Sequence, residues 1–293
     1  YISYKMTELA GIYPITPAST MAEHIDKWSS SNELNFFGDK VKVIEMQSEA
    51  GAIGLVHGAL QSGALSSTYT ASQGLLLMIP NLYKIAGELL PGVINVAARS
   101  IATHALSIFC DHQDIYATRQ TGCAILFSSS VQQVMDLTPI SYLSALKGSI
   151  PFINAFDGFR TSHELQKIKM IDIEKIKDLI DQEALEKFRS KALNPGKKIT
   201  RGTTQNDDVY FQNMESRNSY YDRLPYIVEE YMNEINKITN ENYKLFNYYG
   251  SKNATRIIVA MGSVCETRKE TIDYLNERNE NVGLIEVHLY RPF

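Results

Sequence analysis

The sequence predicts an α/β fold, in which a doubly wound, mostly parallel sheet carries helices on both faces. Residues 1–165 alternate short β-rich runs with longer runs of helical length. The strand-like runs are almost continuously apolar and do not alternate between apolar and polar residues. Strands buried on both faces of a parallel sheet have this pattern, and the alternation of strand with helix predicts a layer of helices on either side.

Five strands and five helical runs are expected in this region. The strands are predicted at 42–46, 66–70, 92–98, 123–128 and 151–156, and the helical runs at 19–30, 50–63, 74–90, 130–137 and 140–148. Pro80 is expected to kink or restart its helix, because proline has no N–H to donate.

The chain changes in character after residue 165. Residues 171–193 have the charged, amphipathic pattern of a helix, residues 194–224 have no period and predict a long loop, and residues 225–243 are helical again. A strand within 255–264, a helix at 266–278 and a strand at 282–290 predict the start of a second α/β unit.

These patterns predict a first domain over residues 1–243 and the truncated start of a second domain over residues 244–293. The chain opens at Tyr1 and closes on a strand-like run. We therefore expect a fragment of a longer polypeptide.

Composition excludes several classes of function. The net charge of −4 gives no general attraction for nucleic acid, and no stretch approaches the ~18 apolar residues of a membrane span. The 3 cysteines are scattered without a CxxC pair, so they cannot build a zinc or iron–sulfur site alone. A reduced, intracellular protein is the simplest interpretation.

Two residues stand where ligands of a parallel sheet bind, at the carboxyl ends of strands. Thr16 lies between the two prolines of "YPITP", where it is either a helix N-cap or a hydroxyl held rigidly for a small substrate. Arg99 directly follows the strand at 92–98. It is either a surface arginine or a group that grips a carboxylate with two hydrogen bonds.

Two acids open the small-residue run "EMQSEAGAIG". Glu45 ends a strand and Glu49 lies in the first helical turn, where both would favour the positive end of the helix dipole. The small residues behind Glu49 also allow a backbone or a flat ligand to come close. A carboxyl group held there could exchange a proton with a ligand nitrogen.

Other polar stretches are interpreted as structural. Ser72 is predicted as an N-cap, and residues 161–164 as a capping box. The acids and histidine of 111–114 fit no metal motif, so no metal ligand is predicted. Neither a GxGxxG fingerprint nor a P-loop motif is present, which disfavours a Rossmann nucleotide-binding module.

Several stretches together resemble the pyruvate:ferredoxin (flavodoxin) oxidoreductases, a family of thiamine-diphosphate enzymes. The resemblance rests on "YPITPAST", "EMQSEAGAIGLVHGAL", "TASQGLLLMIPNLYKIAGELLPGV", "ALSIFCDHQDIYATRQTG", "FDGFRTSHE", "RGTTQNDDVYFQN", "MGSVCETRKETIDYL" and "LYRPF". It follows the family's pyrimidine-binding domain and the start of its transketolase C-terminal-like domain. Members fused to a reductase for NADP share this region. One departure is Cys110, where the family pattern has glycine.

The resemblance implies oxidative decarboxylation of pyruvate to acetyl-CoA and carbon dioxide, with electrons passed through iron–sulfur clusters to ferredoxin, flavodoxin or NADP. It implies that Thr16 contacts the substrate, that Glu49 hydrogen-bonds the pyrimidine N1′ of thiamine diphosphate, and that Arg99 binds the pyruvate carboxylate. These three residues are the predicted catalytic set.

The resemblance also implies parts that lie outside this chain. The diphosphate and Mg²⁺ site and the 4Fe–4S clusters belong to other domains, so we expect the isolated chain to be inactive. A homodimer is implied for the full-length protein, located in the cytoplasm or in an organelle such as a hydrogenosome. No nucleic acid or membrane partner is expected.

Two alternatives remain at this point. The protein is an oxidoreductase for another 2-oxo acid, or it is a noncatalytic α/β module used for dimerisation. The presence of Thr16, Glu49 and Arg99 together argues against the second alternative, since a scaffold needs none of them.

Overall fold

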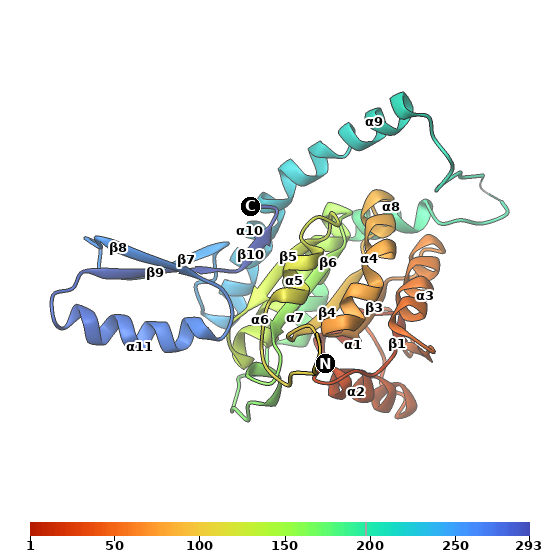
Figure 1. Cartoon of the computed structure of the whole chain (residues 1–293). Coiled ribbons are helices and arrows are strands. Elements are labelled where there is room, and N and C mark those ends of the chain that lie inside the picture. The colour runs from red at the N-terminus through yellow and green to blue at the C-terminus, as the bar shows by residue number, and fades with distance from the viewer. Residues whose placement is uncertain (197) are drawn as a thin grey trace.

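The computed structural model describes residues 1–196 and 198–293. A seven-stranded sheet forms its centre, in the order β10-β5-β6-β4-β3-β1-β2, and a smaller sheet in the order β7-β9-β8 projects to one side (Figure 1). All neighbouring pairs in the large sheet are parallel except β10 with β5. The predicted doubly wound, mostly parallel α/β class is confirmed.

The strands and helices have the following bounds. The strands of the large sheet are β1 (Leu9–Ile12), β2 (Lys42–Glu45), β3 (Ser66–Thr70), β4 (Val93–Ala98), β5 (Ala124–Ser128), β6 (Phe152–Asp157) and β10 (Leu289–Arg291). Those of the small sheet are β7 (Phe246–Gly250), β8 (Arg256–Ala260) and β9 (Val282–Val287). The helices are α1 (Ile2–Lys5), α2 (Ser19–Ser30), α3 (Glu49–Gln61), α4 (Ser72–Gly87), α5 (Gln113–Thr118), α6 (Val131–Gly148), α7 (Ile173–Asp178), α8 (Gln182–Ser190), α9 (Asp207–Glu215), α10 (Asn218–Thr239) and α11 (Val264–Asn276), with a 3₁₀ turn at Thr161–His163.

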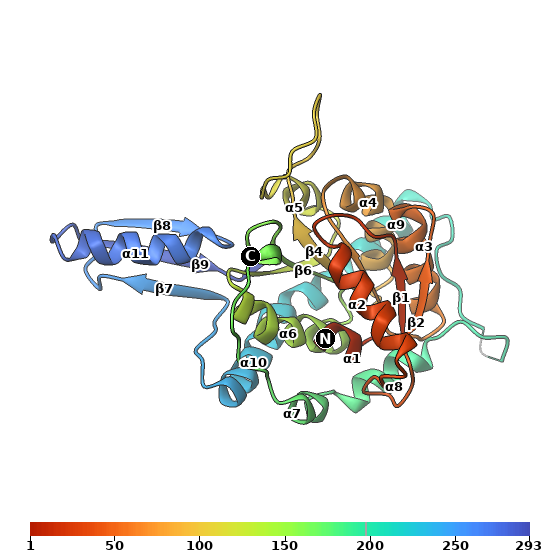
Figure 2. The ribbon, with the colours of Figure 1, turned by 90° about the horizontal axis from the view of Figure 1, so that it is seen from below.

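Helices cover both faces of the large sheet (Figure 2). On one face, α6 and α10 pack with α1, α7 and α8 over apolar side chains that include Leu126 and Phe152. On the other face, α3, α4 and α5 pack over Ile94, Ile125 and Ile153. Consecutive residues such as Phe152 and Ile153 contribute to opposite cores, which explains why β4 and β6 are largely apolar.

The structure differs from several predictions, most of them in the second half of the chain. The predicted loop at 194–224 contains α9 and the first turns of α10, which runs through Pro225. The predicted helix at 171–193 is two short helices, α7 and α8. Pro80 also lies inside α4, which continues past it without restarting. Strands β1 and β7 were not predicted, because both are short and neither has a strong apolar run.

The predicted strand at 282–290 divides between the two sheets. β9 is the central strand of the small sheet, whereas β10 pairs antiparallel with β5 of the large sheet. His288, between them, lies within hydrogen-bond distance of the Phe127 carbonyl, with 3.1 Å from Nδ1 to oxygen. The end of the chain therefore returns to the first sheet.

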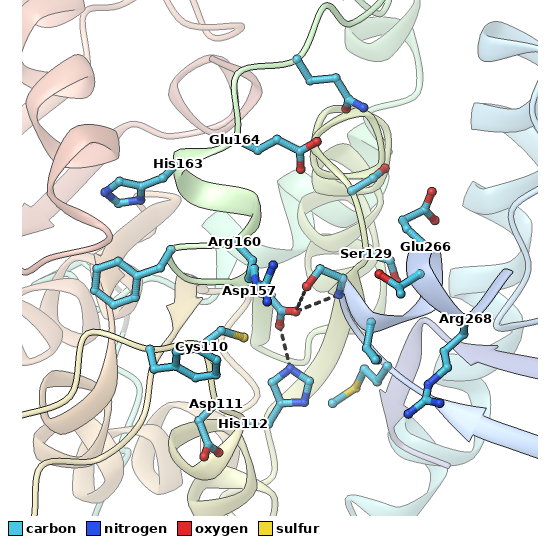
Figure 3. Close-up of a pocket in the computed structure, with 18 of the residues that line it drawn as sticks. Cys110, Asp111, His112, Ser129, Asp157, Arg160, His163, Glu164, Glu266 and Arg268 are labelled. Carbon is cyan, nitrogen blue, oxygen red and sulfur yellow. Dashed lines mark hydrogen bonds and ion pairs between the residues drawn. The ribbon is translucent and has the colours of Figure 1, made fainter. Parts of the chain in front are cut away.

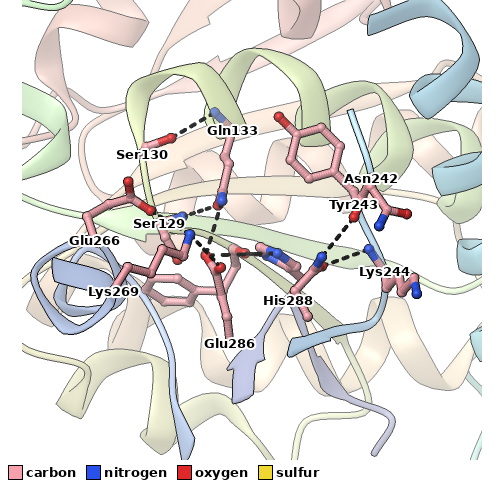
Figure 4. A network of polar contacts seen from close by, with 12 residues as sticks. Ser129, Ser130, Gln133, Asn242, Tyr243, Lys244, Glu266, Lys269, Glu286 and His288 are labelled. Carbon is pink, nitrogen blue, oxygen red and sulfur yellow. Dashed lines mark hydrogen bonds and ion pairs between the residues drawn. The ribbon is translucent and has the colours of Figure 1, made fainter. Parts of the chain in front are cut away.

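A buried polar network joins the small sheet to α6 (Figure 4). Glu286 is 2% exposed, and its carboxylate accepts from Gln133 Nε2 at 3.1 Å and pairs with Lys269 Nζ at 3.0 Å. Burial opposes ionisation of Glu286, but charged and hydrogen-bonded partners outweigh it and lower its pKa. The pairing satisfies a carboxylate that would otherwise be costly to bury.

Within the described residues, no helix combines the length and the apolar character needed to cross a bilayer.

Candidate active site

Arg99 occupies the predicted position at the carboxyl end of β4, and its side chain is buried. Its Nη1 atom donates to the backbone carbonyl of Thr16 at 2.6 Å, and its Nη2 atom donates to Gln73 Oε1 at 3.3 Å. Its Nε atom is buried without a hydrogen-bond partner within the described part of the chain. A buried donor without a partner is costly, and a bound anion would remove that cost.

Asp114, on α5, holds the backbone around Arg99. Its Oδ2 atom accepts from the backbone N–H of Arg99 at 3.0 Å and of Ser72 at 2.8 Å. Burial raises the pKa of Asp114 to about 6, although these N–H donors oppose the rise. One carboxylate therefore ties the start of α4 to the end of β4.

Ser72 does not cap α4 as predicted. Ala71 occupies the N-cap position without a side-chain cap, and Ser72 is the first helical residue, with φ of 51°. Its Oγ donates to the Ser100 carbonyl at 2.7 Å. Ser72 therefore links α4 to the loop that follows Arg99.

Glu49 begins α3 and is 6% exposed. Ser48 caps this helix by accepting from the Gly51 N–H at 3.2 Å, so the Glu49 side chain is not needed as a cap. No hydrogen bond to its carboxyl group is found in the described residues. The two acids of the "EMQSEAGAIG" run therefore differ in burial, since Glu45 is exposed.

Gly74 lets α4 approach Glu49 closely. A Cβ atom at this position would lie 2.7 Å from Glu49 Oε1 and 2.5 Å from Thr70 Oγ1. Thr70 Oγ1 is itself buried without a hydrogen-bond partner among the described residues. The site therefore combines a carboxyl group that makes no hydrogen bond within the described residues, a buried hydroxyl that also lacks a partner there, and a glycine that lets α4 pack tightly against both.

The three predicted residues are brought to one edge of the sheet. Thr16 and Arg99 are in direct contact, and the charge of Glu49 acts on the Arg99 guanidinium. Burial lowers the pKa of Arg99, and the carboxylates of Asp114 and Glu49 oppose that change. Thr16 does not cap a helix, because α2 begins at Ser19 with Ala18 as its N-cap.

A second polar cluster lies beside this site, in a cleft of about 1100 Å³ (Figure 3). Asp157, the last residue of β6, accepts from the backbone N–H and the Oγ of Ser263 at 2.7 and 2.6 Å. Its other oxygen lies 2.7 Å from His112 Nε2. The end of β6, the loop before α5, and the segment from the end of β8 into α11 therefore line the cleft.

Sequence reasoning missed the residues that support the site. Gln73 and Asp114 have no motif of their own, and their partners are distant in the chain. The capping box predicted at 161–164 is also wrong, since a 3₁₀ turn without a side-chain cap forms there. No sequence signal marks Asp114 as a buried structural acid, because it follows Asp111, His112 and Gln113 in a polar stretch.

Comparison with known families agrees with this geometry. Residues 3–233 match a family model described as pyruvate flavodoxin/ferredoxin oxidoreductase, thiamine diphosphate-binding, and residues 254–293 match pyruvate:ferredoxin oxidoreductase core domain II. A pyruvate-flavodoxin oxidoreductase of Enterobacter agglomerans is 59% identical over 293 residues, which are 100% of this chain and 25% of that protein.

Other relatives cover the whole chain as well. A pyruvate:ferredoxin oxidoreductase of Moorella thermoacetica is 56% identical over 100% of this chain and 25% of its own length. A pyruvate dehydrogenase (NADP(+)) of Cryptosporidium parvum is 53% identical over 100% of this chain and 15% of its own length. The chain thus spans a quarter or less of these relatives.

A solved structure shares the fold. The 2-oxoglutarate:ferredoxin oxidoreductase from Magnetococcus marinus superposes with a TM-score of 0.70 and 18% identity, over 99% of this chain and 52% of that one. The family match over most of the chain, together with identities above 50%, leads to one conclusion: this chain belongs to the pyruvate flavodoxin/ferredoxin oxidoreductase family.

Proposed function

We propose that the chain forms the pyrimidine side of a thiamine diphosphate site in a pyruvate oxidoreductase. The proposed reaction oxidatively decarboxylates pyruvate to acetyl-CoA and carbon dioxide. Electrons pass through iron–sulfur clusters to ferredoxin, flavodoxin or NADP. Support comes from the names of the relatives and from the arrangement of Thr16, Glu49 and Arg99 at one sheet edge.

The buried guanidinium of Arg99 is the observation that supports a substrate with a carboxylate group. Two of its nitrogens are held by Thr16 and Gln73, and Nε has no hydrogen-bond partner among the residues that the structure describes. Arginine is suited to carboxylates because its planar fork offers several donors in fixed geometry. In the proposed function, Arg99 binds the pyruvate carboxylate and the exposed Thr16 hydroxyl contacts the rest of the substrate.

Glu49 and its surroundings suit the cofactor. Glu49 is a buried residue whose carboxyl group makes no hydrogen bond within the described residues, so it can bond a ring nitrogen, and Gly74 lets α4 pack closely against it. Glu49 would hold the pyrimidine N1′ of thiamine diphosphate. When bound, the cofactor supplies the electron sink for decarboxylation.

The division into domains is part of the proposal. Residues 1–243 would be the pyrimidine-binding domain, and residues 244–293 the start of a transketolase C-terminal-like domain. The small sheet supports this division because it has an apolar core of its own, around Cys265, Ile272 and Leu284. The Mg²⁺ site, the clusters and a homodimer would belong to the assembled oxidoreductase.

The proposal is tested by assaying pyruvate oxidation with coenzyme A and an electron acceptor. An assembled oxidoreductase that contains this chain is expected to oxidise pyruvate in preference to 2-oxoglutarate, and the 293-residue chain alone is expected to show no turnover. Faster turnover of another 2-oxo acid would overturn the substrate assignment. Turnover by the isolated chain would overturn the claim that it holds only one side of the site.

A further inference from the structure

A cysteine, a histidine and a carboxylate converge in the cleft next to the proposed site. One ligand atom from each of Cys110, His112 and Asp157 lies within 4.8 Å of the other two. Cys110 and His112 belong to the loop before α5, and Asp157 ends β6 (Figure 3). The sequence did not indicate this set, because Asp157 is 45 residues from His112.

We propose that Cys110, His112 and Asp157 form a binding site for a divalent cation of the zinc class. Thiolate, imidazole and carboxylate are the three ligand types that zinc uses in proteins. Mg²⁺ and Ca²⁺ prefer all-oxygen sites, so the sulfur ligand disfavours them. Three protein ligands leave the fourth tetrahedral position open.

The carboxylate is oriented for this role. The Oδ2 atom of Asp157 accepts both hydrogen bonds from Ser263, and the Oδ1 atom faces His112 Nε2 at 2.7 Å. Partners that hold a ligating side chain in place are typical of metal sites. Asp157 is 3% exposed, so its carboxylate has little freedom to turn away.

The imidazole is also held in place by packing. The ring of His112 lies against Phe127, with 4.7 Å between ring centroids, and meets Tyr116 edge-on at 6.2 Å. Its Nε2 atom therefore stays directed at the carboxylate. Two of the three ligands are therefore held side by side before a cation arrives, and binding requires Nε2 and Oδ1 to move apart from their 2.7 Å contact and the Cys110 side chain to turn toward them.

The charges balance. A thiolate and a carboxylate together carry two negative charges, which a divalent cation neutralises. Binding releases the thiol proton of Cys110 to solvent, because the ligand is the thiolate. For Nε2 to bind the cation, the hydrogen between Nε2 and Oδ1 leaves that bridge and the neutral imidazole carries its one proton on Nδ1 instead, so the ring changes tautomer and the thiol proton alone is released.

The open position faces a space large enough for a further ligand. The cleft of about 1100 Å³ is lined on its far side by residues of the small sheet's unit, among them Ser263, Glu266 and Arg268. Water would complete the coordination in the resting protein. The cation would also strengthen the contact between the two sheets, since its carboxylate ligand is bound by Ser263.

The test is titration of the 293-residue chain with Zn²⁺ and with Co²⁺. Calorimetry is expected to show one Zn²⁺ site, and Co²⁺ is expected to give a near-ultraviolet thiolate-to-metal charge-transfer band. Cys123 and Cys265 are fully buried, so this band would report Cys110. Cys110→Ser should abolish the band, and Asp157→Asn should weaken binding by roughly 10- to 100-fold.

His163→Gln is the matched control, because His163 lines the same cleft without belonging to the cluster. It should bind Zn²⁺ as the wild type does. Circular dichroism checks that each variant is folded, and Cys110→Ser keeps the test decisive if Asp157→Asn unfolds. The absence of Zn²⁺ binding, or binding that Cys110→Ser leaves unchanged, overturns the proposal.

Discussion

Arg99 donates a hydrogen bond from Nη1 to the backbone carbonyl of Thr16 at 2.6 Å, across a separation of 83 residues. The contact joins the loop after β1 to the end of β4. It uses the main chain of Thr16 and leaves its exposed hydroxyl for other partners. The same contact fixes one end of the guanidinium, so in the proposed function Nε would be available to an anion without reorganisation of the side chain.

Removing this guanidinium should weaken the binding of pyruvate. In an assembled oxidoreductase containing this chain, we expect Arg99→Ala to raise KM for pyruvate about 10- to 100-fold, because a hydrogen bond to a charged group contributes about 1.5–3 kcal/mol. Steady-state kinetics measure the effect. The exposed Arg119 provides a control, and Arg119→Ala should leave KM unchanged. An unaltered KM in Arg99→Ala would remove Arg99 from the substrate site.

Glu49→Gln should slow proton exchange at C2 of the bound cofactor by roughly 10²–10⁴-fold, the usual contribution of a positioned acid or base. Glutamine keeps the shape of the side chain but cannot exchange a proton. Exchange into deuterated solvent, followed by NMR, measures the rate. Glu45→Gln changes an exposed acid nearby and should exchange normally. If both variants behave alike, Glu49 does not have the proposed role.

Gly74→Ala should destabilise the chain, because its Cβ would meet Glu49 Oε1 at 2.7 Å and Thr70 Oγ1 at 2.5 Å. Overpacking of this kind costs about 1–3 kcal/mol. Gly58, in α3, has no atom within 4 Å of its added Cβ, so Gly58→Ala should stabilise the helix by about 0.5–1 kcal/mol. Urea unfolding measures both changes. Equal stability of the two variants would contradict the close packing at Gly74.

Asp114 should make the stability of the chain depend on pH. Burial raises its pKa from an ordinary 3.8 to about 6, so the folded state favours the protonated form. This contribution is fully present below about pH 4 and is lost as the pH rises through 6. At ~1.4 kcal/mol per pH unit, the loss is about 3 kcal/mol.

Urea unfolding of Asp114→Asn between pH 4 and pH 7 measures this contribution. The difference in unfolding free energy, wild type minus variant, should fall by that amount across the range. Asp207→Asn, an exposed change on α9, should give a constant difference. A flat profile for Asp114→Asn would show that its carboxyl is not held as the structure indicates.

The sequence by itself determined the α/β class and the placement of the main site residues. The mainly apolar runs of β4, β5 and β6 identify buried parallel strands, because such strands meet helices on both faces. Parallel strands align their carboxyl ends, so the position of Arg99 directly after β4 was enough to place it at the ligand edge. The short strand β1 and helix α9 have patterns too weak for this reasoning.

Only the tertiary structure decided which distant residues meet. Asp114 reaches the Arg99 and Ser72 backbones, and Gly74 closes on Glu49, through contacts that no local pattern encodes. The division of residues 282–290 between two sheets depends on pairing with β5 and β8, since strand propensity does not choose a partner. The cluster of Cys110, His112 and Asp157 has the same origin, because the loop before α5 meets the end of β6 only after the sheet has formed.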